Sequence, residues 1–260
     1  MDLCYRRTGS GPPLALIHGI GSRWQVWEPV LDRLADERDV VALDLPGFGA
    51  SPMPPAGTPA GAASLTRLVS EFLDDLGLER PHVAGNSLGG LIALELAKHG
   101  RVASATALSP AGFHNSREAV FERTSLRVTV RVARLLAPRA DRISASPLMR
   151  QLTWSQFVAH PRKLGAADAA ASARALAAAP WFDDTLPAIL AKPFTGGERI
   201  EVPVTIAWAE KDRLLLPRQA PRAARAVPGA RLVMLTDCGH VPTYDDPEQV
   251  ARVLLEGSSV

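Results

Sequence analysis

The chain has 260 residues, 47% of them hydrophobic, which is enough to bury one large core. Its 29 basic and 27 acidic residues give a net charge of +2 without a long run of one sign, which excludes a surface built for nucleic acid. The N-terminal residues carry no apolar signal run, and no uninterrupted apolar stretch of about 18 residues occurs. We therefore expect a cytoplasmic protein that does not bind a membrane.

Short apolar runs alternate with amphipathic stretches over the first half of the chain. This alternation predicts strands over 3–8, 14–17, 39–43, 82–85 and 103–108, and helices over 27–35, 65–76 and 89–100. Two further apolar runs, 202–209 and 231–235, predict strands near the C-terminus. Helices that alternate with strands predict a mostly parallel, doubly wound α/β sheet.

The alternation stops from about Gly112 to Gly197, where the sequence becomes helical and rich in Arg and Ala. We interpret residues 113–195 as a helical cap inserted into a core formed by 1–112 and 196–260. Four arginines recur in the cap at helical spacing, and this pattern favours a solvated helix face over an anion-binding stripe. They are Arg123, Arg127, Arg131 and Arg134. Four cap aromatics either line a pocket or pack the cap on the core: Trp154, Phe157, Trp181 and Phe182.

The stretch Gly85-Asn86-Ser87-Leu88-Gly89 lies between an apolar strand and an apolar helix. A strand that turns sharply into a helix holds its corner residue in a strained conformation, and flanking glycines avoid the collisions that a Cβ would make. The helix behind the corner directs unpaired N–H groups toward it. This context favours Ser87 as a nucleophile over an idle serine in a tight turn.

A nucleophilic serine needs a base and a carboxylate that orients the base. Asp212 follows the strand predicted over 202–209 and is the candidate acid, while His240 follows the next strand and is the candidate base. Ligands bind beyond the carboxyl ends of parallel strands, where Ser87, Asp212 and His240 all fall. The alternatives to Asp212 are Glu210 and, less favoured, Asp237.

A second oxyanion donor is expected after the strand over 14–17, in the run His18-Gly19-Ile20-Gly21. We assign the backbone N–H groups of Ile20 and Leu88 as the two donors, with Gly21 as the alternative to Ile20. His18 is favoured as a hydrogen-bonding brace of this loop over a second catalytic base.

These motifs, together with Asp44-Leu45-Pro46-Gly47-Phe48-Gly49 and Gly239-His240-Val241-Pro242, resemble those of the α/β-hydrolase superfamily in content and order. The resemblance implies an α/β-hydrolase fold with a helical cap. It also implies a Ser87, Asp212 and His240 triad with Ile20 and Leu88 as oxyanion donors. Asp44 lies in a turn that, in the family, supports the site without taking part in the chemistry.

We therefore predict a serine hydrolase that cleaves carboxylic esters through an acyl-enzyme, with a small-molecule ester as substrate and without a cofactor. One alternative is a carbon-carbon bond hydrolase of the meta-cleavage type, whose elbow the Ser87 motif also resembles. This chain departs from the motifs of that subfamily at two positions, with Val241 after His240 and Ser22 after Gly21. Epoxide hydrolases are disfavoured because they use a carboxylate where this chain has Ser87. A ligand-sensing relative without enzymatic activity stays open.

The two cysteines, Cys4 and Cys238, are too few for a disulfide framework and wrongly spaced for a metal site. We therefore expect no metal. Cys238 is interpreted as a small buried residue of the loop before His240, and Cys4 as a strand residue.

Overall fold

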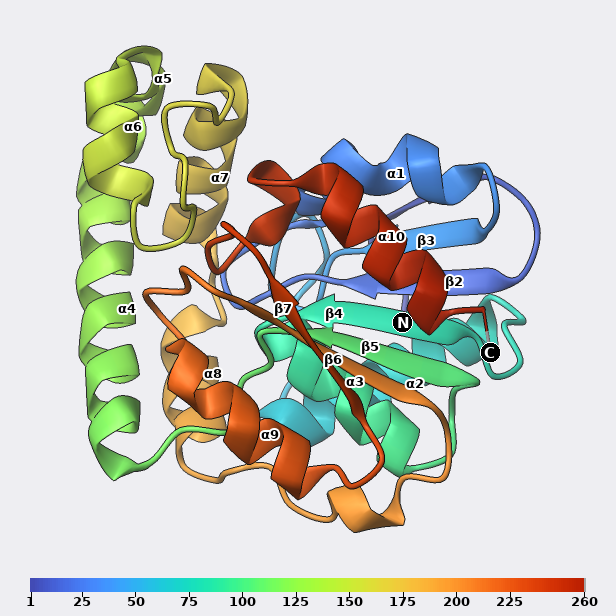
Figure 1. Cartoon of the computed structure of the whole chain (residues 1–260). Helices are drawn as coiled ribbons and strands as arrows, with labels where there is room; N and C mark the ends of the chain where they lie inside the picture. The colour runs from blue at the N-terminus through green and yellow to red at the C-terminus, as the bar shows by residue number, and fades with distance from the viewer. Residues whose placement is uncertain (260) are drawn as a thin grey trace.

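The computed structural model describes residues 1–259, within which seven strands form one sheet in the order β1-β3-β2-β4-β5-β6-β7 (Figure 1). Strand β1 pairs with β3 in antiparallel orientation, and every other neighbouring pair is parallel. The strands are β1 (Tyr5–Thr8), β2 (Pro13–Ile17), β3 (Asp39–Leu43), β4 (His82–Asn86), β5 (Ser104–Leu108), β6 (Val204–Ala209) and β7 (Arg231–Leu235).

Helices cover both faces of this sheet and bury a separate apolar core on each face. On one face, α1 (Glu28–Ala35) packs beside α10 (Pro247–Gly257) over a core that includes Trp27 and Leu254. On the other face, α2 (Ala62–Asp75) packs beside α3 (Leu88–Lys98), with α9 (Ala220–Ala226) on the same core. The predicted fold class, a doubly wound sheet of the α/β-hydrolase type, is confirmed.

Five helices form the cap between β5 and β6: α4 (Ser116–Leu136), α5 (Ala140–Ala145), α6 (Pro147–Trp154), α7 (Ala166–Ala178) and α8 (Phe182–Leu190). The first four stand at one side of the sheet, as the left part of Figure 1 shows. Helix α4 begins with a capping box, in which the Asn115 side chain accepts from Glu118 N and the Glu118 carboxylate accepts from Asn115 N. The division of the chain at 112/113 and 195/196 stays a prediction.

The arginine stripe of α4 faces solvent for most of its length. Arg127 and Arg131 are exposed, Arg134 is exposed and lies 2.8 Å from the Asp183 carboxylate, and Arg123 is half-buried. No helix among residues 1–259 is long and apolar enough to cross a bilayer. Short 3-10 helices complete the chain: η1 (Trp24–Trp27), η2 (Ala137–Arg139), η3 (Gly197–Arg199), η4 (Pro217–Gln219) and η5 (Pro242–Tyr244).

Several predicted boundaries differ from those of the structure. Cys4 was expected in a strand but lies before β1, where its N–H donates to the Ser51 hydroxyl instead of joining the sheet. The strand expected from 202 begins at Val204, after Pro203, which has no N–H to donate to a ladder. The helix expected from 65 begins at Ala62, and the one expected from 89 begins at Leu88.

Candidate active site

Ser87 is the corner residue between β4 and α3, and its backbone is strained. It has φ 57° and ψ −114°, a conformation that costs energy for any residue with a Cβ. The turn is tight because both neighbouring glycines touch backbone. A Cβ at Gly85 would lie 2.1 Å from Gly89 O, and a Cβ at Gly89 would lie 2.0 Å from Ile17 O. The sequence around Ser87 therefore allows a close approach of strand and helix that larger residues would prevent.

Asp212 and His240 meet beyond the ends of β6 and β7. His240 Nδ1 lies 2.7 Å from Asp212 Oδ2, and both side chains are buried. The other carboxylate oxygen, Oδ1, accepts hydrogen bonds from Leu214 N at 2.9 Å and from Leu215 N at 2.8 Å. This leaves His240 Nε2 as the ring nitrogen free to face a reacting group.

Ser87 and His240 line the same cavity, whose volume is about 70 Å³. Asn86 connects their two loops, since its side-chain amide donates to His240 O at 2.9 Å and to Leu108 O at 3.2 Å. Within residues 1–259 the hydrogen bonds of Ser87 are made by its backbone and that of the His240 ring goes to Asp212, so none joins the Ser87 hydroxyl to the ring. Hydrogen bonds of this kind often tighten only when substrate binds.

The two candidate oxyanion donors are Leu88, which follows Ser87 in the chain, and Ile20, in the loop after β2. Leu88 is the first residue of α3, so its N–H has no acceptor within the helix. Ile20 and Gly21 line the cavity, and the chain before them runs close to the serine, because a Cβ at Gly19 would lie 3.2 Å from Ser87 Cβ. The loop after β2 therefore passes beside the serine and lines the same cavity.

The amino-acid sequence matches the model of one known protein family over most of its length. The model described as the alpha/beta hydrolase family matches residues 14–253. The chain belongs to the alpha/beta hydrolase family. Its seven-stranded sheet and its solved structural neighbours agree with this.

Individual relatives of this chain carry different names. The chain is 32% identical over 251 residues to a "dihydrolipoyllysine-residue acetyltransferase component of acetoin cleaving system" of Cupriavidus necator, covering 91% of this chain and 61% of that protein. The chain thus spans about three fifths of that relative's length. It is 32% identical over 203 residues to "Epoxide hydrolase EphH" of Mycobacterium tuberculosis, covering 74% of this chain and 92% of the relative. A "membrane phospholipase A", described as a bacterial virulence factor, superposes with a TM-score of 0.78 and 26% identity, covering 98% of this chain and 83% of that one.

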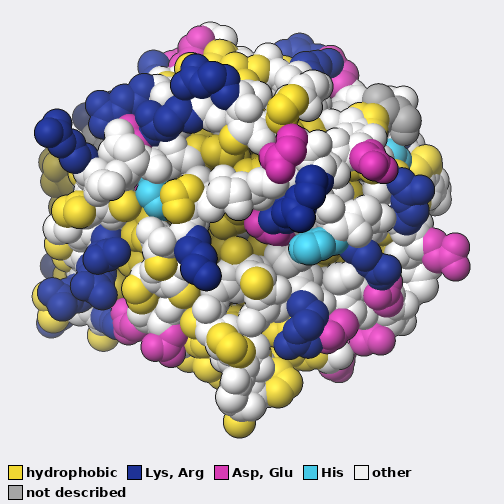
Figure 2. Space-filling view, turned by 90° about the horizontal axis from the view of Figure 1, so that it is seen from below, with side chains coloured by type: hydrophobic (Ala, Val, Ile, Leu, Met, Phe, Trp, Pro, Cys, Tyr) yellow, Lys and Arg dark blue, Asp and Glu magenta, His cyan; other side chains and the backbone are white. Residues whose placement is uncertain are grey.

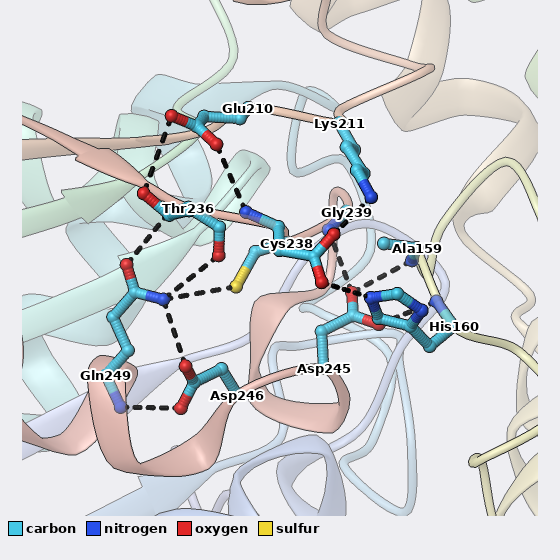
Figure 3. A network of polar contacts seen from close by, with 11 residues as sticks. Ala159, His160, Glu210, Lys211, Thr236, Cys238, Gly239, Asp245, Asp246 and Gln249 are labelled. Carbon is cyan, nitrogen blue, oxygen red and sulfur yellow. Dashed lines mark hydrogen bonds and ion pairs between the residues drawn. The ribbon is translucent and has the colours of Figure 1, made fainter.

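The two alternative acids do not contact His240. The Glu210 carboxylate accepts from Asp237 N at 3.2 Å and from the Thr236 hydroxyl at 3.5 Å (Figure 3). Asp237 pairs with Lys211 and lies 2.7 Å from the His160 ring. Both contacts lower the pKa of Asp237, and the contact with Lys211 has the largest effect. Asp212 is the carboxylate that contacts the His240 ring.

Asp245 is an organising residue that the sequence did not reveal. Its carboxylate accepts from Gly239 N at 2.8 Å and from the N–H groups of Ala159 and His160, both at 2.9 Å (Figure 3). The next residue, Asp246, caps α10, so nothing in the sequence distinguishes the roles of the two aspartates. Asp245 thus ties the loop that carries His240 to the cap.

His18 is fully buried and braces the loop after β2, as predicted. Its Nε2 accepts from Leu45 N at 3.0 Å, so the proton of the neutral ring is on Nδ1, which donates to Gly19 O at 2.7 Å. Burial lowers the pKa of His18, although the nearby Asp44 carboxylate opposes this shift. Asp44 supports the turn after β3 by accepting from Ala50 N, and it connects this turn to η1 by accepting from Trp24 N.

The cap aromatics divide into two pairs. Trp154 and Phe157 line the cavity, with ring centroids 5.9 Å apart, whereas Trp181 and Phe182 are buried in the main core. Further residues around the cavity were not foreseen, because they come from separate loops and cap helices. They are Val26, Leu126, Val158, Ser172, Leu176, Leu214, Val241 and Tyr244.

Cys238 lies two residues before His240 and is fully buried. Burial, together with nearby carboxylates of which Asp245 contributes most, raises its pKa to about 12. The thiol therefore stays protonated at neutral pH and is a poor nucleophile. Among residues 1–259, no three His, Cys, Asp or Glu side chains gather in a way that could hold a metal ion.

Glu122 of α4 is a buried carboxyl group. Burial raises its pKa to about 7, although a hydrogen bond from the Gln219 amide at 2.8 Å opposes the shift. Because the pKa in the folded state lies above the ordinary 4.5, folding favours the protonated form, and stability falls as pH rises from about 4.5 to 7. Glu122→Gln keeps an acceptor for Gln219 and removes the ionisation.

We expect Glu122→Gln to raise the melting temperature at pH 8 by several degrees and to have a much smaller effect at pH 4.5. Thermal unfolding followed by circular dichroism at the two pH values measures this. The exposed Glu79→Gln is the control. A Glu122→Gln protein that is less stable than wild type at pH 8 would show that the ionised carboxylate contributes to the fold.

Proposed function

We propose that this hydrolase cleaves carboxylic esters, with Ser87 as nucleophile, His240 as general base and Asp212 as the acid that orients the base. The observation that carries the proposal is a strained, cavity-lining Ser87 that shares its cavity with a histidine held by a buried aspartate 2.7 Å away. The structural likeness to a protein named as a phospholipase A, at 26% identity, supports attack on an ester carbonyl.

In the first step, Ser87 Oγ attacks the ester carbonyl carbon while His240 Nε2 takes the hydroxyl proton. The Asp212 carboxylate, bonded to His240 Nδ1, stabilises the imidazolium that forms. The N–H groups of Ile20 and Leu88 bind the negative oxygen of the tetrahedral intermediate. His240 then gives the proton to the leaving alcohol, so that the alcohol departs and an acyl-Ser87 ester remains.

In the second step, His240 takes a proton from water as the water oxygen attacks the acyl-Ser87 carbonyl. His240 then returns this proton to Ser87 Oγ, so that the carboxylic acid is released and the serine is restored. Both steps use only groups of this chain and water. We propose a cytoplasmic enzyme with a small-molecule ester as its partner.

The test is turnover of a panel that contains p-nitrophenyl acetate, a phenyl carbamate and styrene oxide, with Ser87→Ala as the matched variant. We expect wild type to hydrolyse the acetate and Ser87→Ala to lose at least about 10⁴-fold of that rate. Opening of the epoxide without ester cleavage would instead favour epoxide hydrolysis, the activity in the name of one relative. Equal ester turnover by the two proteins would refute the role of Ser87.

A further inference from the structure

The cap contains a second cavity, lined by residues of α4, α5, α6 and α7. Its volume is about 330 Å³, compared with about 70 Å³ for the cavity at Ser87. An apolar cavity of about 150 Å³ is enough to hold benzene. The cap cavity can therefore hold a group of many carbon atoms, whereas the cavity at Ser87 alone has room only for a small one.

The lining of the cap cavity is apolar in most places and includes no charged residue. Several of its polar side chains already have partners within the cap. The Thr129 hydroxyl donates to Ser125 O at 2.9 Å, the Gln156 amide to the Ser125 hydroxyl at 2.5 Å, and the Thr153 hydroxyl to Met149 O at 2.8 Å. A lining of this kind favours an uncharged, apolar ligand, because a charged group would find no counter-ion there.

Three side chains separate the cap cavity from the one at Ser87, since Trp154, Phe157 and Leu176 line both. The Phe157 backbone is fixed relative to the candidate base, because Phe157 O accepts from Val241 N at 2.8 Å, next to His240. None of the three is fully buried, although Phe157 and Leu176 pack against the main core. These three residues are therefore the part of the lining that the two cavities share.

The cap cavity also reaches the protein surface. Three of its lining residues are exposed: Val128 by 54%, Val132 by 43% and Leu152 by 66%. Hydrophobic side chains lie at the surface among Lys and Arg over the left part of Figure 2, the side on which Figure 1 places α4. Clustered exposed apolar groups of this kind commonly mark binding sites.

We infer that the cap cavity binds an unbranched aliphatic chain of the substrate, so that the hydrolase acts on long-chain esters. This rests on the proposed function, which places the ester group at Ser87. The chain extends from there past Trp154 and Leu176 into the cap. The ester carries this chain on its acyl or on its alcohol side, and the experiment distinguishes the two.

Ala173 of α7 lines the cap cavity and does not line the cavity at Ser87, so Ala173→Trp fills the proposed chain site. The matched control is Ala178→Trp, at an exposed position of the same helix. We compare kcat/KM for p-nitrophenyl decanoate with that for p-nitrophenyl acetate, and decyl acetate with ethyl acetate. Ala173→Trp is expected to lower one of these ratios by about tenfold or more, and Ala178→Trp to leave both unchanged.

A fall in the decanoate ratio assigns the chain to the acyl side, and a fall in the decyl acetate ratio assigns it to the alcohol side. Trp154→Ala, which opens the shared wall, is expected to raise the same ratio. If Ala173→Trp does not fold, Ala133→Phe fills the cavity from α4 instead.

Binding of decanol to the Ser87→Ala protein, measured by calorimetry, tests the site without catalysis. Decanol is expected to bind, and Ala173→Trp in the same background to abolish binding. Decanol binding to Ser87→Ala, combined with a wild-type protein that cleaves no ester, would retain the chain site and refute the proposed function. Acetate hydrolysis with unchanged ratios and no decanol binding would overturn the chain site and leave the proposed function standing.

Discussion

Asp212→Asn is expected to lower kcat for ester hydrolysis by about 10⁴-fold while the protein stays folded. The carboxylate lies 2.7 Å from His240 Nδ1, and in the proposed mechanism it stabilises the imidazolium that forms when Ser87 loses its proton. An amide has no charge to do this, and its NH₂ group favours the wrong tautomer of the ring. Because an Asn side-chain oxygen can still accept from Leu214 N and Leu215 N, the loop should keep its shape.

Glu210→Gln is the matched control for Asp212→Asn. Glu210 lies just after the same strand, but its carboxylate contacts Asp237 N and Thr236, away from His240. Its variant should keep turnover within about threefold of wild type, as expected for a surface change away from the reacting groups. Near-normal turnover of Asp212→Asn, combined with loss in Glu210→Gln, would reverse the assignment of the acid.

Gly89→Ala is expected to destabilise the fold by about 3 kcal/mol or more and to reduce ester turnover at the same time. The added methyl group would lie 2.0 Å from Ile17 O and 2.7 Å from His18 O, both backbone atoms. Backbone cannot rotate away as a side chain can, so α3 and the end of β2 must separate. That movement would shift Ser87, at the start of α3, relative to Ile20.

Urea unfolding and kcat for p-nitrophenyl acetate measure the two effects of Gly89→Ala. Gly90→Ala is the neighbouring control, because a Cβ there would meet Pro110 Cβ at 3.0 Å and Gly85 O at 3.1 Å, a much milder contact. We expect it to cost clearly less than Gly89→Ala. Equal effects of the two variants would mean that the close approach at Gly89 does not limit the geometry of the corner.

The sequence predicted the sheet and the approximate location of the site because both depend on local patterns. Apolar strands followed by Ser87, Asp212 and His240 indicate three strand ends, and parallel strands bring such ends to one edge of a sheet. The structure brings His240 to Asp212 and to the cavity that Ser87 lines. Their catalytic roles stay predictions.

Contacts between distant parts of the chain could not be predicted in this way. Asn86 binds His240 O across 154 residues, and Asp245 binds Ala159 N across 86. Neither pair leaves a pattern in the sequence, because one polar residue resembles another until the fold brings them together. The cap is a similar case, since the sequence left open whether its aromatics line a pocket or pack on the core, and the structure places Trp154 at the cavity and Trp181 in the main core.

The central claim is that Ser87 is an activated nucleophile, and reaction with a serine-directed phosphonate, followed by intact-mass spectrometry, tests it most directly. An ordinary serine hydroxyl reacts poorly, so labelling requires the base and the oxyanion donors to be in place around it. We predict one adduct per wild-type chain, no adduct in Ser87→Ala, and severe loss of labelling in His240→Ala. An unlabelled wild type, or full labelling of Ser87→Ala, would contradict the account.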